Sequence, residues 1–176
     1  KEINVLINNL NDNSPEIIST QFSFSGEENQ TSIPDSTIEA TDADNDELTF
    51  FIEVPVPEIN GSQTYLDIDQ NGRLFFALPP DYELDSSYGA SLSGKVFVSD
   101  GLFFSEKLDV TVEIINVNDN KPTITSTHLN EIIDENDSRS NDPSKLLKLI
   151  TIVNATDDDN DKLSFFIPAN SGLYNK

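Results

Sequence analysis

Apolar residues fall in short runs that turn residues separate. The clearest run covers residues 105–115, where Leu108, Val110, Val112 and Ile114 alternate with polar residues. Alternation with a period of two is typical of a β-strand that buries one face. Comparable runs predict further strands at residues 17–24, 37–41, 48–54, 65–68, 74–78 and 95–99.

The segments between these runs have the chemistry of turns. Asn71-Gly72 lies between two predicted strands and is typical of a tight β-hairpin turn. No long stretch has the period of an amphipathic helix, and residues 144–152 are the one debatable segment. Seven short strands within about 100 residues predict an all-β fold, namely an antiparallel Greek-key sandwich of the immunoglobulin-like type.

The sequence also repeats itself. Residues 40–52 return at 155–167, residues 10–15 at 117–122, and residues 28–29 at 135–136. A period of about 110 residues is the size of a domain, and a polar insertion at residues 137–145 explains the unequal spacings. We therefore expect tandem repeats: 1–13 as the last strand and linker of a preceding repeat, 14–120 as a complete repeat with its linker, and 121–176 as the first half of the next.

Charge sharpens this interpretation. The chain has 176 residues, of which 10 are basic and 32 acidic, which gives a formal net charge of −22. Such an excess argues against nucleic acid or an anionic membrane as a partner. Because the acidic residues alternate with apolar runs such as residues 48–52, we expect a folded protein whose carboxylates are matched by cations, not a disordered tail.

Other features bear on the compartment. There is no cysteine, so a disulfide framework and a thiolate zinc site are excluded. No apolar run has the roughly 18 residues of a membrane span, and we expect any anchor to lie outside this sequence. Four N-x-S/T sequons are candidate glycosylation sites of a secreted glycoprotein: Asn29, Asn60, Asn136 and Asn154.

Several acidic pairs stand at the ends of predicted strands. Asp42 and Asp44 are two residues apart, as are Asp81 and Glu83. In an extended chain such side chains point the same way about 7 Å apart, so a pair can bind one hard cation. Calcium suits these sites because it takes six to eight oxygen ligands in flexible geometry. A single motif is equally typical of a solvated turn.

Two rival interpretations of these acids fail. An EF-hand loop starting at Asp42 would need Gly at its sixth position, where Glu47 stands, and strands follow instead of a helix. Asp81 and Glu83 could form a glycosidase pair, but the chain has no tryptophan to line a sugar cleft. We therefore expect a non-enzymatic protein.

The motifs occur in a fixed order: Glu28-Asn29, Asp42-Ala43-Asp44, Asp81-Tyr82-Glu83, Asp100-Gly101 and Asn116-Val117-Asn118-Asp119-Asn120. This series resembles the calcium-binding motifs of cadherin extracellular repeats, over essentially the whole chain. The resemblance is to a non-classical cadherin, either protocadherin-like or long, and it implies three calcium ions at each linker between repeats.

The resemblance also implies the ligands. For the linker after the complete repeat they are Glu28, Asp81, Glu83, Asn116, Asn118, Asp119, Asn120, Asp157 and Asp159. For the linker before it they are Asn9, Asn11, Asp12, Asn13, Asp42, Asp44 and Asp100. Both linkers begin with Asn, at Asn9 and Asn116, where the family usually has Asp. The lost charge predicts a weaker middle site, and further ligands are expected from residues beyond this sequence.

The function implied is that of a calcium-dependent cell-adhesion ectodomain at the extracellular face of the plasma membrane. Calcium ions at the linkers would stiffen the rod of repeats. Other cadherin-type ectodomains would be the partners, in homophilic or heterophilic pairs. Two alternatives remain open: spacer or ligand-binding repeats of a large receptor, and a microbial cadherin-like surface adhesin.

Overall fold

The computed structural model describes residues 1–55, 65–84, 91–126 and 152–166, and every regular element in these ranges is a β-strand. The all-β class is therefore confirmed. The chain divides into unit 1, Lys1–Val117, and unit 2, Asn118–Lys176. The described residues include no helix long and apolar enough to cross a membrane.

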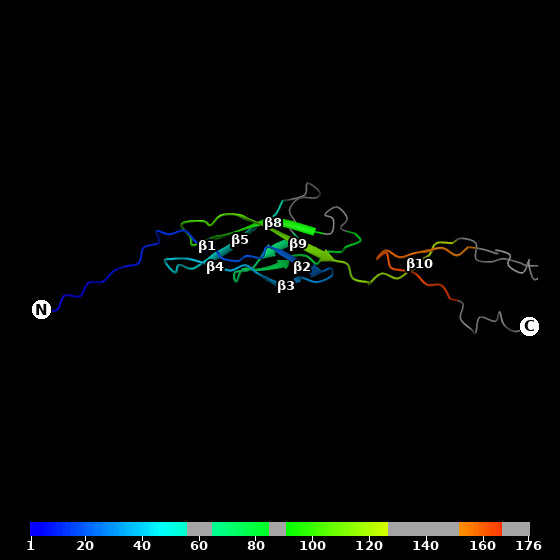
Figure 1. Cartoon of the computed structure of the whole chain (residues 1–176), viewed down its shortest axis with the longest axis horizontal. Helices are drawn as coiled ribbons and strands as arrows, with labels where there is room; N and C mark the ends of the chain where they lie inside the picture. The colour runs from blue at the N-terminus through cyan, green and yellow to red at the C-terminus, as the bar shows by residue number, and fades with distance from the viewer. Residues whose placement is uncertain (56–64, 85–90, 127–151, 167–176) are drawn as a thin grey trace, which may run out of the picture. The chain divides into compact units, whose positions relative to one another are not determined.

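Unit 1 contains two larger sheets and one short strand pair (Figure 1). The four-stranded sheet has the order β2 (Ser23–Glu27), β9 (Leu108–Ile115), β8 (Ser91–Ser99) and β5 (Thr49–Glu53). The three-stranded sheet has the order β3 (Ser32–Thr37), β7 (Arg73–Phe76) and β6 (Leu66–Ile68). The short pair joins β1 (Glu16–Ile17) to β4 (Ala40–Thr41), and unit 2 contains the pair β10 (Thr123–Ile124) and β11 (Ala155–Thr156).

One hydrophobic cluster joins the two larger sheets of unit 1. Val96, Val110 and Val112 from the four-stranded sheet and Leu74 and Phe76 from the three-stranded sheet are fully buried in it. The alternation read from residues 105–115 is therefore confirmed: Val110, Val112 and Ile114 of β9 are buried, and the polar residues that alternate with them are exposed. Burying each such side chain contributes about 1.5–3 kcal/mol.

Two glycines allow close approaches around this core. A Cβ on Gly26 in β2 would lie 2.6 Å from Cε2 of Phe76, so a side chain there would displace the ring. Gly72 has φ 77° in the turn between β6 and β7, which an L side chain rarely adopts. Asp69 closes this turn, since its Oδ1 accepts the N–H groups of Asn71 at 2.8 Å and Arg73 at 2.9 Å. The hairpin predicted at Asn71-Gly72 is confirmed.

The expectation of a purely antiparallel sandwich is wrong at one position. The single strand predicted at 17–24 is two strands: β1 pairs with β4, and β2 pairs with β9 in parallel. Alternation identifies which face of a strand is buried, but it carries no information on the direction of the neighbouring strand.

The strand predicted at 37–41 is also divided. The structure has β3 before it and β4 at its end, with an irregular register in β3 where Asp35 has φ 49°. Ser36 is buried at this irregularity, and its hydroxyl lies 2.8 Å from the carbonyl oxygens of Ile33 and Leu74. Of the other predictions, residues 137–145, nearly all of 144–152, and the sequons Asn60 and Asn136 lie outside the described residues.

Candidate metal sites

A first acidic cluster follows β4. We define it as Asn11, Asp42, Asp44, Asp46 and Asp100. Carboxylate oxygens of the three aspartates at 42, 44 and 46 lie within 4.8 Å of one another. The loop is folded around Asp42, whose Oδ1 accepts the N–H of Asp44 at 2.8 Å and that of Asp46 at 3.3 Å. Three side chains two residues apart are thereby gathered at one point.

The segment before β1 is tied to this loop through Asp44. Its Oδ2 accepts the N–H groups of Asn13 at 2.8 Å and Asp12 at 3.0 Å, and its Oδ1 accepts the Asn13 amide at 2.9 Å. The Asn9 amide donates to the Asp44 carbonyl oxygen at 2.6 Å. The Asn13 N–H, ahead of the other bonds, holds the pKa of Asp44 below its ordinary value. Asp44 therefore stays ionised and fixes the segment in place.

Asp100 reaches the cluster from the turn after β8. Its Oδ1 accepts the N–H groups of Leu102 at 2.7 Å and Phe103 at 2.6 Å. Burial acts to raise the pKa of Asp100, but the hydrogen bonds from Phe103, Leu102 and Asn11 together lower it below the ordinary value. The turn therefore presents an ionised carboxylate to the cluster.

Four oxygen atoms of the first acidic cluster are buried without a hydrogen-bond partner among the described residues. They are Asn11 Oδ1, Asp42 Oδ2, Asp46 Oδ2 and Asp100 Oδ2. An unsatisfied buried acceptor costs about 1–3 kcal/mol, so native structures contain few of them. An all-oxygen donor set with several carboxylates is what Ca²⁺ prefers, and the residues present therefore fit a calcium ion.

Burial, followed by the charges of Asp42, Asp44 and Asp100, raises the pKa of Asp46 above its ordinary value. Charge in this cluster is therefore not balanced by neighbouring side chains. A bound cation would supply the missing balance.

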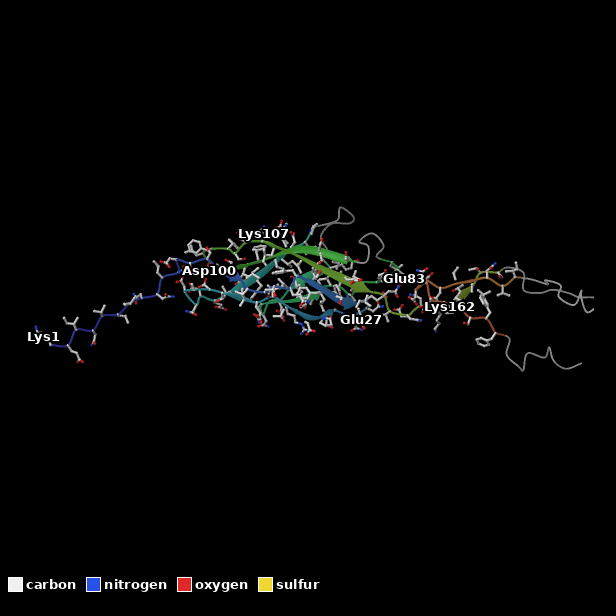
Figure 2. The ribbon with its side chains drawn as sticks, viewed as in Figure 1. Lys1, Glu27, Glu83, Asp100, Lys107 and Lys162 are labelled. Atoms are coloured by element: carbon white, nitrogen blue, oxygen red, sulfur yellow. The ribbon has the colours of Figure 1, made fainter. Side chains whose placement is uncertain are left out.

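A second acidic cluster, Glu28, Asp81 and Glu83, lies at the other end of unit 1. Figure 2 labels Asp100 at one end of the unit and Glu83 at the opposite end. Carboxylate oxygens of the three residues lie within 4.8 Å of one another. Glu28, just after β2, is 1% exposed and accepts the N–H groups of Tyr82 and Val117, both at 2.7 Å. The Asn116 amide donates to Glu83 at 3.0 Å.

Unit 2 repeats the pattern of the first acidic cluster. Asp157, Asp159 and Asp161 have carboxylate oxygens within 4.8 Å of one another, after β11. Asn120 donates its N–H to Asp159 Oδ2 at 2.8 Å and its amide to Asp159 Oδ1 at 3.0 Å, as Asn13 does to Asp44. The Asn118 amide donates to Asp161.

The structure thus groups most of the predicted ligands within their own units. Asp12 and Asp119 each accept the side-chain amide of the next residue, Asn13 or Asn120, at 2.9 and 2.8 Å. The predicted ligand set lacked Asp46 and its copy Asp161. The sequence shows only that both loops carry aspartates at three alternate positions, a pattern that solvated turns share. Of the sequons, Asn29 and Asn154 are described and exposed.

Comparison with known proteins gives consistent relatives. No family model matches the chain. Cadherin-4 of Caenorhabditis elegans is 33% identical over 141 residues, covering 77% of this chain and 3% of that protein. Protocadherin gamma-A1 of Homo sapiens is 28% identical over 178 residues, covering 96% of this chain and 17% of that protein. The chain therefore spans a small part of the length of these relatives.

Solved structures share the fold. Drosophila N-cadherin EC1-4 matches with a TM-score of 0.60 and 20% identity, over 82% of this chain and 34% of that one. The protocadherin gammaB7 EC3-6 cis-dimer structure matches with a TM-score of 0.62 and 20% identity, over 85% of this chain and 37% of that one.

Proposed function

This chain belongs to the cadherin family, and from that premise we propose that it is part of a calcium-dependent cell-adhesion ectodomain at the extracellular face of the plasma membrane. Its role is mechanical and non-enzymatic: calcium ions at the linkers stiffen the rod of repeats. The observation that carries the proposal is the set of four buried oxygens in the first acidic cluster that have no hydrogen-bond partner among the described residues.

The physical basis is charge compensation. Two carboxylates 4 Å apart repel by about 4 kcal/mol at an effective dielectric constant near 20, and the first acidic cluster holds three within 4.8 Å. Metal-free, the loop is under electrostatic strain. A calcium ion that binds Asp42, Asp100 and Asn11 offsets this repulsion. It also ties residues 9–13 more firmly to the body of unit 1, because Asn11 belongs to that segment, which Asp44 holds through hydrogen bonds.

The remaining proposed ligands follow the cadherin motifs. Around the linker at residues 116–120 we propose Glu28, Asp81, Glu83, Asn116, Asn118, Asp119, Asn120, Asp157 and Asp159. Around residues 9–13 we propose Asn9, Asn11, Asp12, the Asn13 carbonyl, Asp42, Asp44 and Asp100. Extracellular calcium modules bind at about 10⁻⁴–10⁻³ M, so occupancy would follow extracellular calcium.

X-ray scattering of the full chain tests the stiffening. In millimolar calcium we expect the profile of a stiff rod, and in chelator the profile of domains joined by a hinge. Magnesium at equal ionic strength is the control, because it screens charge equally but dehydrates reluctantly and demands octahedral geometry. Identical profiles in calcium and chelator would contradict the proposal.

Partners are proposed from the same premise: other cadherin-type ectodomains, homophilic or heterophilic. Beads coated with the full chain should aggregate in calcium and disperse in chelator if the chain itself adheres. A role as spacer repeats of a large receptor is the second candidate. Calcium-dependent scattering without bead aggregation would select the spacer role.

A further inference from the structure

Asp46 is the one aspartate of the first acidic cluster that the cadherin motifs do not assign. It lies two residues beyond the Asp42-Ala43-Asp44 motif and is half-buried. Its carboxylate lies within 4.8 Å of those of Asp42 and Asp44. Its Oδ2 is buried and has no hydrogen-bond partner among the described residues. A structural aspartate in a turn would use this oxygen to accept a hydrogen bond, as Asp69 does in the β6–β7 turn.

A second observation points to a ligand at the same place. Asp42 is 8% exposed, and while its Oδ1 accepts two N–H groups, its Oδ2 has no hydrogen-bond partner in the described chain. The two hydrogen bonds to Oδ1 fix the orientation of the Asp42 side chain, so Oδ2 is held in the cluster. Asn11 and Asp100 each contribute one more oxygen of the same kind. Buried acceptors gathered in this way call for a positive charge or a donor.

We propose that Asp46, through its Oδ2, is a further ligand of the calcium ion that Asn11, Asp42 and Asp100 bind. This inference rests on the proposed function. Three carboxylates and one amide oxygen give the site a formal charge of −3, against +2 for the ion. Backbone carbonyls and water complete the six to eight ligands that calcium takes.

Asp44 and Asp46 differ in the hydrogen bonds that their carboxylates accept. Both carboxylate oxygens of Asp44 accept hydrogen bonds from the preceding segment, so Asp44 holds that segment besides its proposed part in calcium binding. Asp46 has its Oδ2 left for the ion. The same spacing returns in unit 2, where Asp161 lies within 4.8 Å of Asp157 and Asp159. There, however, Asp161 Oδ2 accepts the Asn118 amide, so unit 2 repeats the spacing of the aspartates but not the unpartnered oxygen.

The test is a calcium titration of the full chain, followed site by site in amide NMR spectra. The N–H of Asp46 donates to Asp42 and that of Phe103 to Asp100, so both signals report on this site. Asp46→Asn keeps the side chain's size and removes its charge. We expect it to raise the calcium concentration at the midpoint at least tenfold. Asp46→Ser should do the same, and the two variants together exclude an effect of the amide itself.

Glu47→Gln is the matched control, since this exposed neighbour changes the net charge equally. We expect a shift of less than twofold. If Asp42→Asn abolishes the titration while Asp46→Asn behaves like Glu47→Gln, Asp46 is no ligand and only this inference falls. If the unmodified chain shows no calcium-dependent shift of either signal, the proposed function falls and this inference with it.

Discussion

Asp42→Asn should stabilise the chain in chelator and destabilise it in calcium. Oδ1 of Asp42 accepts two N–H groups, whereas Oδ2 has no hydrogen-bond partner in the described part of the chain. An Asn oxygen can still accept the N–H of Asp44 at 2.8 Å. The NH₂ group then takes the place of the oxygen that has no partner among the described residues, beside the carboxylate of Asp46, and it supplies a donor where the unmodified chain has only acceptors. In chelator the variant should therefore be more stable than the unmodified chain.

The magnitudes follow from the two terms. Relief of an unsatisfied buried acceptor is worth about 1–3 kcal/mol, and we take the lower end because the site is close to solvent. A ligand at 100 times its dissociation constant stabilises the native state by about 2.7 kcal/mol, which for an affinity of about 10⁻⁴ M corresponds to roughly 10 mM calcium. If the variant loses most of this term, it should be less stable than the unmodified chain by about 1–2 kcal/mol in calcium.

Urea unfolding followed by circular dichroism at pH 7, in chelator and in about 10 mM calcium, measures both differences. Glu47→Gln is the control, and its difference in unfolding free energy from the unmodified chain should be the same in chelator and in calcium. The reasoning is refuted if Asp42→Asn destabilises the chain by the same amount with and without calcium. Asp42 would then be a structural turn residue and no ligand.

Three other changes test separate parts of the structure. Phe76→Ala should lower the free energy of unfolding by about 3–5 kcal/mol, equally in calcium and in chelator, because the ring is fully buried between the sheets. Urea unfolding measures this loss of stability, and a loss that depended on calcium would contradict the place of Phe76 in the core. Asn9→Asp should destabilise the metal-free chain, since a carboxylate would face the Asp44 carbonyl oxygen. The added charge should raise the calcium affinity several-fold, as measured by calorimetry, and an unchanged affinity would show that residue 9 is not a ligand. Lys107→Met removes the ammonium that lowers the pKa of Glu53. The stabilisation is present above the ordinary value of 4.5 and is lost as pH falls through the lowered folded value, so the stabilities of the two chains in chelator should differ at pH 7 and converge in acid. A difference in stability that did not change with pH would exclude the ion pair as its source.

Most of the fold could be predicted from local patterns. Alternation located β9, and Asn71-Gly72 located the β6–β7 hairpin. What escaped prediction depends on partners distant in sequence. β3 is mostly polar in sequence, and its buried Ser36 is satisfied only because the carbonyl oxygen of Leu74 lies beside it. The parallel pairing of β2 with β9 likewise depends on the sheet order, which no local pattern records.

The candidate sites divide in the same way. Motif order identified Asp42, Asp81 and Asp100 as residues of interest, since their spacing is visible in the sequence. It did not identify Asp46, because a third alternate aspartate in a turn is indistinguishable from a solvated one until its surroundings are known. The missing information was the burial of its Oδ2, which is a property of the folded loop.

The parallel pairing of β2 with β9 has a consequence for how unit 1 responds to tension. The five residue pairs from Ser23–Thr111 to Glu27–Ile115 join the strand near the start of the unit to the strand at its end. A pull on the two ends of the unit draws β2 toward its own N-terminus and β9 toward its own C-terminus. Because the strands are parallel, these directions are opposite along one line, and the bonds between them are loaded in shear, all at once. In an antiparallel pair loaded at the same termini, the hydrogen bonds would break one at a time. In the parallel pair of β2 and β9, the five residue pairs must break together before the sandwich can extend.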